Sequence, residues 1–148
     1  KGPKLHAVTT ERYNGYLEGI KEAGFKFDKR YIFDGDFALN SGREAVRHFL
    51  SLNDRPDAIV ASTDLMAIGA LKELNRNSVK VPEEIKVVGF DNIPMAELMQ
   101  PTLTTIAQPI IELGVNAAEL LIKKIENPET SNQQIVMQCT LIERESSI

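Results

Sequence analysis

The 148-residue sequence has the composition of an ordinary globular chain, with 43% hydrophobic and 26% charged residues. This balance argues against disorder, and the length suits one domain or a large part of one. The formal net charge is −4 and the basic residues are scattered, so the chain has no basic surface of the kind that nucleic-acid phosphates require. Neither a membrane-spanning hydrophobic run nor a signal-peptide core occurs, so we expect a cytoplasmic chain that does not contact a membrane.

The first part of the chain predicts a helix, a strand and a second helix. Hydrophobic residues in the segment 10–23 recur at helical spacing, and Gly24 stands where such a helix would end. Residues 30–33 have strand composition and are followed by the turn residues Asp34-Gly35-Asp36. A second helix is expected from about residue 40 to residue 52.

The middle of the chain repeats the order of strand and helix. Residues 57–61 and 85–90 are almost continuous hydrophobic runs. The first precedes Ser62-Thr63-Asp64, any of which can cap a helix at residues 65–75, and the second precedes a short helix at residues 94–99. Hydrophobic strands that alternate with helices are typical of a parallel sheet covered on both faces, which predicts an α/β fold.

The last part of the chain predicts a short strand, a long helix and a final strand. The strand at residues 103–107 leads to a helix at residues 109–126, whose hydrophobic stripe contains Ile110, Leu113, Ala117, Leu121 and Ile125. A polar linker covers residues 127–134, and residues 135–144 alternate as a strand. Cys139, which lies in that strand, is expected to be a small core residue.

No sequence pattern typical of an enzyme or a metal site occurs. The chain lacks a phosphate-binding glycine loop, a nucleophile elbow and paired metal ligands. His6 and His48 stand far apart, and neither has a cysteine or another histidine nearby. We therefore expect no catalytic residue, no metal and no cofactor.

Polar residues follow three of the expected strands, at the edge where open parallel sheets bind their ligands. They are Asp34-Gly35-Asp36-Phe37, Ser62-Thr63-Asp64 and Asp91-Asn92. A polyhydroxylated ligand needs carboxylate acceptors, an arginine donor and an aromatic face, which Asp91, Arg12 and Phe37 can supply together with Thr63. For Phe37 and Thr63, a place in the core or a helix cap is an equal alternative.

The segment Val87-Val88-Gly89-Phe90-Asp91-Asn92, followed by Pro101-Thr102-Leu103-Thr104-Thr105-Ile106 and Gln108, resembles the effector-binding domain of the lactose-repressor family. The run from Ser62 to Ala70, the Arg12-x-x-Gly15-Tyr16 segment and Gly2-Pro3 support the resemblance, which covers nearly the whole chain. It implies a two-lobed fold like that of periplasmic sugar-binding proteins. The effector would lie between the lobes, and a preceding helix-turn-helix domain would read operator DNA.

The resemblance also divides the chain. Residues 1–107 would form the carboxy lobe, incomplete at its start, and residues 108–128 a helix that belongs to the amino lobe. Residues 129–148 would form a linker and a final strand that returns to the carboxy lobe. The helix-turn-helix domain would be absent. We expect the long helix, without the amino lobe, to pack on a second copy of the chain or to fold back on the carboxy lobe.

Family resemblance assigns roles to single residues. Arg12 would reach the effector's hydroxyl groups, Asp91 would accept hydrogen bonds from two of them, and Phe37 would form an aromatic wall. Thr63 stands where many family members carry Asn. Ile110 and Leu113 match positions that face the pocket from the other lobe.

A second set of residues matches the family's dimer contact. Leu65, Ile68 and Lys72 share one face of the helix at residues 65–75, and Met99 matches a residue of the same contact. A place in the core of the lobe is the alternative for these residues.

These features predict the effector-binding and dimerising part of a sugar-responsive transcriptional repressor. The effector would be a small molecule, with a sugar favoured, and operator DNA would be bound only through the absent domain. The alternative is the sugar-binding component of a transporter that shares the fold. The Pro-x-Leu-Thr-Thr-Ile-x-Gln run resembles the repressors more closely, and a small α/β enzyme has little support.

Overall fold

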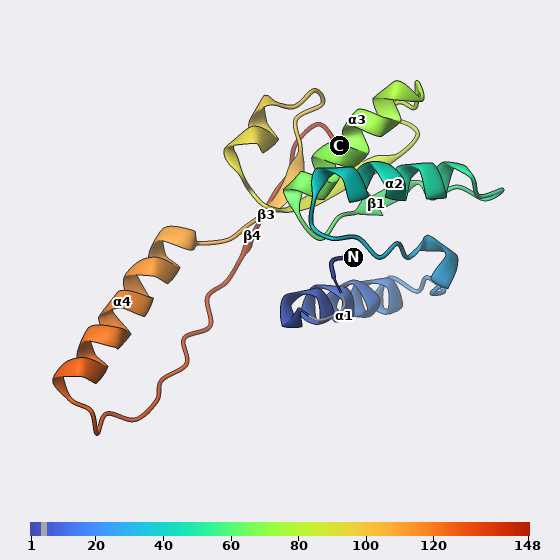
Figure 1. Ribbon diagram of the computed structural model, residues 1–148. Coiled ribbons are helices and arrows are strands. Elements are labelled where there is room, and N and C mark those ends of the chain that lie inside the picture. The colour runs from blue at the N-terminus through green and yellow to red at the C-terminus, as the bar shows by residue number, and fades with distance from the viewer. Residues whose placement is uncertain (4–5) are drawn as a thin grey trace.

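The computed structural model describes residues 1–3 and 6–148, and its helices and strands alternate along the chain from α2 onwards (Figure 1). The helices are α1 (Ala7–Glu22), α2 (Leu39–Leu50), α3 (Asp64–Arg76) and α4 (Ile110–Glu126), with short 3-10 helices η1 (Lys29–Tyr31) and η2 (Pro94–Leu98). The strands are β1 (Ala58–Val60), β2 (Lys86–Asp91), β3 (Thr104–Ala107) and β4 (Thr140–Ile142). The predicted α/β class is confirmed.

The strands form one four-stranded sheet in the order β1-β2-β3-β4. β2 lies parallel to both β1 and β3, whereas β4 runs antiparallel to β3. Because the three parallel strands point the same way, the residues that follow β1, β2 and β3 meet at one edge of the sheet. That edge carries the polar segments singled out in the sequence.

Helices α2 and α3 pack against each other with their backbones in contact. A Cβ atom added to Gly42 would overlap the Met66 carbonyl group, and one added to Gly69 would overlap the Leu39 carbonyl group. Only glycine fits at these two crossing points. The pair contributes much of the hydrophobic core, which also includes side chains from β1 and β2.

The strand predicted at residues 30–33 is wrong. Residues Lys29–Tyr31 form the 3-10 helix η1, because the Asp28 carboxylate accepts a hydrogen bond from the Arg30 backbone N–H and starts a tight turn. The backbone after η1 is extended, and among residues 1–3 and 6–148 it pairs with Lys1, which donates to the Phe33 carbonyl (2.6 Å) and accepts from the Gly35 N–H (2.6 Å). A strand needs a longer ladder than this.

The final strand is shorter than the alternation at residues 135–144 predicts. β4 contains only Thr140–Ile142, because the neighbouring strand β3 offers only Thr104–Ala107 for pairing. The expected core position of Cys139 is also wrong, since this residue is exposed. Alternating hydrophobic residues form a strand only where another strand lies beside them.

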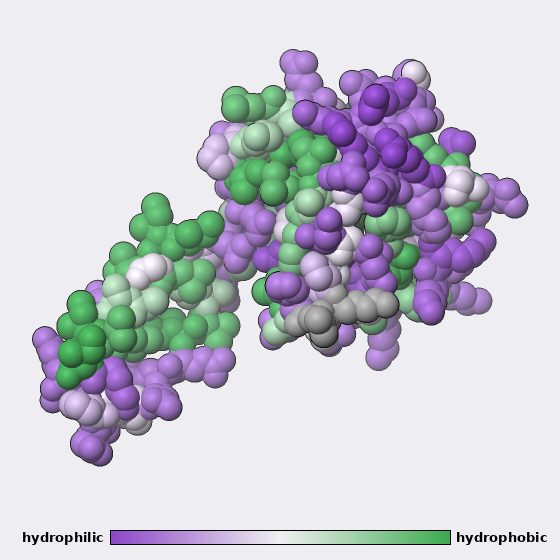
Figure 2. Space-filling model, in the orientation of Figure 1, coloured by the Kyte–Doolittle hydropathy of each residue, from purple (hydrophilic) through white to green (hydrophobic). Residues whose placement is uncertain are grey.

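Helix α4 lies apart from the rest of the chain (Figure 1) and buries none of its residues. Hydrophobic side chains cover much of its surface (Figure 2), and Ile111 is 84% exposed. The expectation that α4 folds back on the carboxy lobe is therefore wrong, whereas its packing on a second copy stays a prediction. No helix within residues 1–3 and 6–148 is long and hydrophobic enough to span a membrane.

Candidate functional site

Polar side chains meet at the edge of the sheet where the parallel strands end. Asp91 is the last residue of β2, Ser62 and Thr63 follow β1, and Gln108 follows β3. The topology therefore brings together segments that are far apart in the sequence, as expected for a ligand site in an open parallel sheet.

Arg12 of α1 connects this edge to the first helix. Its Nη1 donates to the Ser62 carbonyl, and its Nη2 lies 3.4 Å from Asp91 Oδ1. The guanidinium carbon stands 3.7 Å from the centre of the Phe90 ring, a cation–π distance. These three contacts fix the Arg12 fork beside the ends of β1 and β2.

The Asp91 carboxylate is bound on one side and open on the other. Its Oδ1 accepts a hydrogen bond from Gln108 Nε2 at 2.8 Å and the longer one from Arg12. Its Oδ2 accepts no hydrogen bond from any residue in the described part of the chain. One carboxylate oxygen is thus oriented by two donors, while the other can accept a hydrogen bond from a ligand.

The surroundings of Asp91 disfavour its charge. Burial raises the pKa of Asp91 above the ordinary carboxyl value, the Arg12 charge opposes this effect, and the nearby Asp64 carboxylate adds to it. The raised pKa means that the ionised carboxylate has fewer stabilising partners here than in water. A hydroxyl donor from a ligand would supply such a partner.

The backbone at the end of β2 adopts a conformation that L-residues rarely populate. The φ angles of Asp91 and Asn92 are 123° and 56°, and such positive values persist only where surrounding contacts hold them. The Asn92 N–H donates to Thr105 Oγ1 (3.3 Å), and the next N–H, of Ile93, donates to Asp64 Oδ2 (2.8 Å).

Thr63 and Phe37 lie next to each other beside this edge. Thr63 caps α3, since its Oγ1 accepts from the Met66 N–H, and the same hydroxyl donates to the Phe37 carbonyl at 3.3 Å. The Phe37 ring stands edge-on to the His6 ring at 5.7 Å and fills the space beside Gly2. The capping alternative for Thr63 is therefore confirmed, and ligand contacts by Thr63 and Phe37 remain predictions.

The structure does not bring Ile110 and Leu113 to the Asp91 site. Both lie on α4, where their side chains are 63% and 43% exposed. Their predicted place opposite Asp91 depends on a second lobe, so it stays a prediction.

The residues predicted for a dimer contact differ in exposure. Leu65 and Lys72 are exposed on α3, and Met99 is partly buried against the core. Ile68, in contrast, is completely buried in the hydrophobic core. Its side chain is therefore not available for the predicted dimer contact, and the core alternative applies to it.

Sequence analysis missed two residues of this site, Gln108 and Asp64. Gln108 belongs to the Pro-x-Leu-Thr-Thr-Ile-x-Gln run, and its position just after β3 was the available signal. The sequence predicts Asp64, like Ser62 and Thr63, as a possible helix cap, but its side chain is completely buried.

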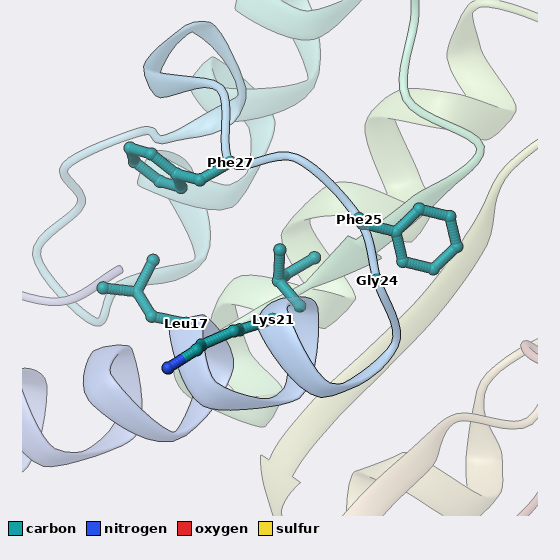
Figure 3. A pocket seen from close by; sticks show the side chains of 6 residues that line it. Leu17, Lys21, Gly24, Phe25 and Phe27 are labelled. Atoms are coloured by element: carbon teal, nitrogen blue, oxygen red, sulfur yellow. The ribbon is translucent and has the colours of Figure 1, made fainter.

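A separate hollow lies at the end of α1 (Figure 3). Its volume is about 510 Å³, and it is lined by Leu17, Ile20, Lys21, Gly24, Phe25 and Phe27. It contains none of the predicted site residues. The described residues also contain no cluster of His, Cys, Asp and Glu side chains suited to a metal ion.

Comparison with known proteins gives consistent matches. Residues 2–147 match the family of periplasmic binding protein-like domains. The chain is 39% identical over 146 residues to the ribose operon repressor of Escherichia coli, covering 99% of this chain and 44% of that protein. It is 36% identical over 146 residues to the HTH-type transcriptional repressor CytR of Escherichia coli, covering 99% of this chain and 43% of that protein.

Solved structures agree with these relatives. A putative LacI transcriptional regulator from Bacillus cereus subsp. cytotoxis superimposes with a TM-score of 0.95 at 33% identity, covering 99% of this chain and 52% of that one. The transcriptional regulator CelR–cellobiose complex gives 0.93 at 35% identity, covering 99% and 45%. The chain spans about half the length of these relatives. It belongs to the family of periplasmic binding protein-like domains and is similar to the corresponding part of LacI-family transcriptional regulators.

Proposed function

We propose that this chain is the effector-binding part of a transcriptional repressor whose DNA binding responds to a sugar. One observation carries the proposal. At the edge of the parallel sheet, Asp91 Oδ1 is held by Arg12 and Gln108, and Oδ2 accepts no hydrogen bond from the part of the chain that the structure describes. A carboxylate oriented in this way is suited to accept a hydrogen bond from a ligand hydroxyl.

The chemistry of the edge favours a neutral polyhydroxylated ligand. Sugar hydroxyls donate to carboxylates and accept from guanidinium groups, so Asp91 and Arg12 can serve one ligand together. Because Arg12 and Asp91 carry opposite charges and form an ion pair, their net charge is small and would attract a charged ligand only weakly. Phe37 offers an aromatic ring beside the same edge, suited to the apolar side of a sugar.

The relatives support a carbohydrate and a regulatory role. The ribose operon repressor is named for a sugar operon, and the CelR regulator was solved with cellobiose. Both are regulators, which favours transcriptional control over transport. Since the relatives are transcriptional regulators, catalysis is not part of the proposal.

Partners of the complete protein follow from the same proposal. The chain carries a formal net charge of −4, so operator DNA would be bound by a separate helix-turn-helix domain in the cytoplasm. A homodimer would use the exposed residues Leu65 and Lys72 with Met99, and Ile110 and Leu113 would face the ligand from a second lobe.

A thermal-shift screen of the full-length protein tests the proposal. The panel contains pentoses, hexoses and disaccharides, including D-ribose and cellobiose. A sugar at a hundred times its Kd stabilises the folded state by about 2.7 kcal/mol. We expect at least one sugar to raise the melting temperature of the wild type.

Variants Asp91→Ala and Arg12→Ala connect that result to the site. Each leaves ligand hydroxyls unpaired, at about 1–3 kcal/mol per lost partner, so the shift should shrink strongly in both. Glu83→Ala, an exposed residue before β2, is the control and should keep the full shift. Wild-type shifts in the Asp91 and Arg12 variants would remove these residues from the ligand site.

A further inference from the structure

Asp64 is a buried carboxylate that points away from its own helix. It is the first residue of α3 and has no accessible surface. Its Oδ1 accepts a hydrogen bond from the Thr105 hydroxyl of β3, and its Oδ2 accepts one from the Ile93 N–H at 2.8 Å. Thr63, not Asp64, caps α3.

The residue of β2 that lies against the Asp64 carboxylate is a glycine, Gly89. A Cβ atom added to Gly89 of β2 would overlap Asp64 Oδ1 and approach Leu103 at 3.1 Å. Glycine is therefore required at position 89, in the middle of the Val-Val-Gly-Phe-Asp strand. Asp64, which belongs to α3, thus contacts both β2 and β3.

Asp64 also reaches the strained turn that carries Asp91. Its partner Thr105 accepts from the Asn92 N–H at 3.3 Å, and its other partner is the next backbone N–H, that of Ile93. These bonds hold the backbone N–H groups of Asn92 and Ile93, directly after Asp91. The φ angles of Asp91 and Asn92 are positive. A backbone of this kind needs such restraint to persist.

We infer that Asp64 is a positioning residue of the Asp91 site: through Thr105 and Ile93 it fixes the turn at residues 91–92 and thereby aims the Asp91 carboxylate. The inference rests on the proposed function in one respect only, namely that Asp91 binds a ligand. A carboxylate does this better than an amide, because it accepts both hydrogen bonds without placing a donor opposite another donor.

The variant Asp64→Asn keeps the shape of the side chain and removes one acceptor. Glu73→Gln is a matched control, because Glu73 is the other buried carboxylate of α3 but pairs with Arg47 at 2.7 Å. Both variants remove one buried charge from the same helix. Only the first contacts the turn after β2.

Amide hydrogen exchange and carboxyl NMR titration of the full-length protein test this inference without a ligand. In Asp64→Asn, we expect exchange at Asn92 and Ile93 to rise at least tenfold and the pKa of Asp91 to fall. In Glu73→Gln, both readouts should match the wild type even though the melting temperature falls. Because no sugar is added, a failed sugar screen would not change the outcome.

Thr105→Val is the second variant, for the case in which Asp64→Asn does not fold. It removes the hydroxyl that joins Asp64 to the Asn92 N–H and keeps the Ile93 bond. Exchange should then rise at Asn92 and stay near the wild-type rate at Ile93. Unchanged exchange at both positions in a folded Asp64→Asn or Thr105→Val protein would overturn the inference, as would equal changes in Glu73→Gln.

Discussion

Gln108 donates its side-chain amide to Asp91 Oδ1 across 2.8 Å and thereby joins the open carboxylate to the start of α4. Its own carbonyl accepts from the Ile110 N–H at 2.9 Å, so the same residue forms the link between β3 and α4. A ligand that binds Asp91 therefore also acts next to the segment from which α4 departs. Gln108 thus connects the Asp91 carboxylate directly to the start of α4.

Gln108→Leu should weaken ligand binding through the loss of this bond. Leucine keeps the bulk of the side chain but leaves Asp91 Oδ1 with the longer Arg12 contact alone. The loss of one hydrogen bond corresponds to about 1 kcal/mol, or roughly a fivefold rise in Kd. Isothermal titration calorimetry with the sugar found in the thermal-shift screen measures it. Gln133→Leu, an exposed linker residue, is the control, and equal Kd values in both variants would exclude Gln108 from the site.

Ligand affinity should fall on mild acidification. The pKa of Asp91 is raised by burial, so its carboxylate takes up a proton at a higher pH than an ordinary Asp carboxyl does, and it then loses acceptor capacity. The contribution of Asp91 to the free energy of unfolding has the opposite trend: it is fully present below the ordinary pKa and is lost as pH rises through the raised pKa.

Asp91→Asn separates these two effects. At neutral pH the neutral amide should leave the melting temperature equal or higher, while the affinity for the sugar falls and its dependence on pH disappears. Calorimetry and thermal melts between pH 4 and pH 8, about the range in which carboxyls with raised pKa titrate, measure both. A lower melting temperature with unchanged affinity would contradict the account.

Gly69→Ala should destabilise the pair α2 and α3. The added Cβ would overlap the Leu39 carbonyl group, and forcing extra volume into a packed interior costs about 1–3 kcal/mol. Gly19→Ala is a matched control on α1, where a Cβ atom meets nothing within 4 Å. There alanine should add about 0.5–1 kcal/mol through its higher helix propensity. Urea unfolding gives both values, and the same sign for both would be inconsistent with the packing described.

The exposed face of α4 should drive self-association of this chain. Each large hydrophobic side chain that is fully buried by a partner stabilises the contact by about 1.5–3 kcal/mol. Light scattering at micromolar concentration should show dimers or larger species. The triple variant Ile111→Lys, Ile122→Lys and Ile125→Lys changes three exposed residues and should remain monomeric. A wild-type chain that stays monomeric would show that the exposed hydrophobic face of α4 does not drive self-association.

The sequence predicted the fold correctly in those segments whose hydrophobic pattern agrees with their packing and strand pairing in the structure. Continuous hydrophobic runs predicted β1 and β2, helical spacing predicted α1 and α4, and turn or capping residues predicted the starts of α2 and α3. Composition alone was insufficient at residues 30–33 and 135–139, because a strand also requires a neighbouring strand, and neither segment forms a strand in the described part of the chain. The outward position of Cys139 has the same cause.

The candidate site was predictable to a similar degree. Asp91 lies at the edge where the parallel strands end, and Arg12 of α1 lies beside it, while their contacts with a ligand stay predictions. The inward turn of Asp64 and the bond from Gln108 were not predictable, because the direction of a side chain at a strand end depends on strands distant in sequence. Ile68 took the core place that was its alternative, because helical spacing groups residues on one face but does not show which of them are buried.

A structure of the full-length protein bound to the sugar found in the screen tests the central claim most directly. The account predicts a sugar hydroxyl within hydrogen-bond distance of Asp91 Oδ2, a second one at the Arg12 guanidinium, and Oδ1 still held by Gln108. A sugar bound elsewhere, with Asp91 contacting only Arg12 and Gln108 as it does now, would contradict it.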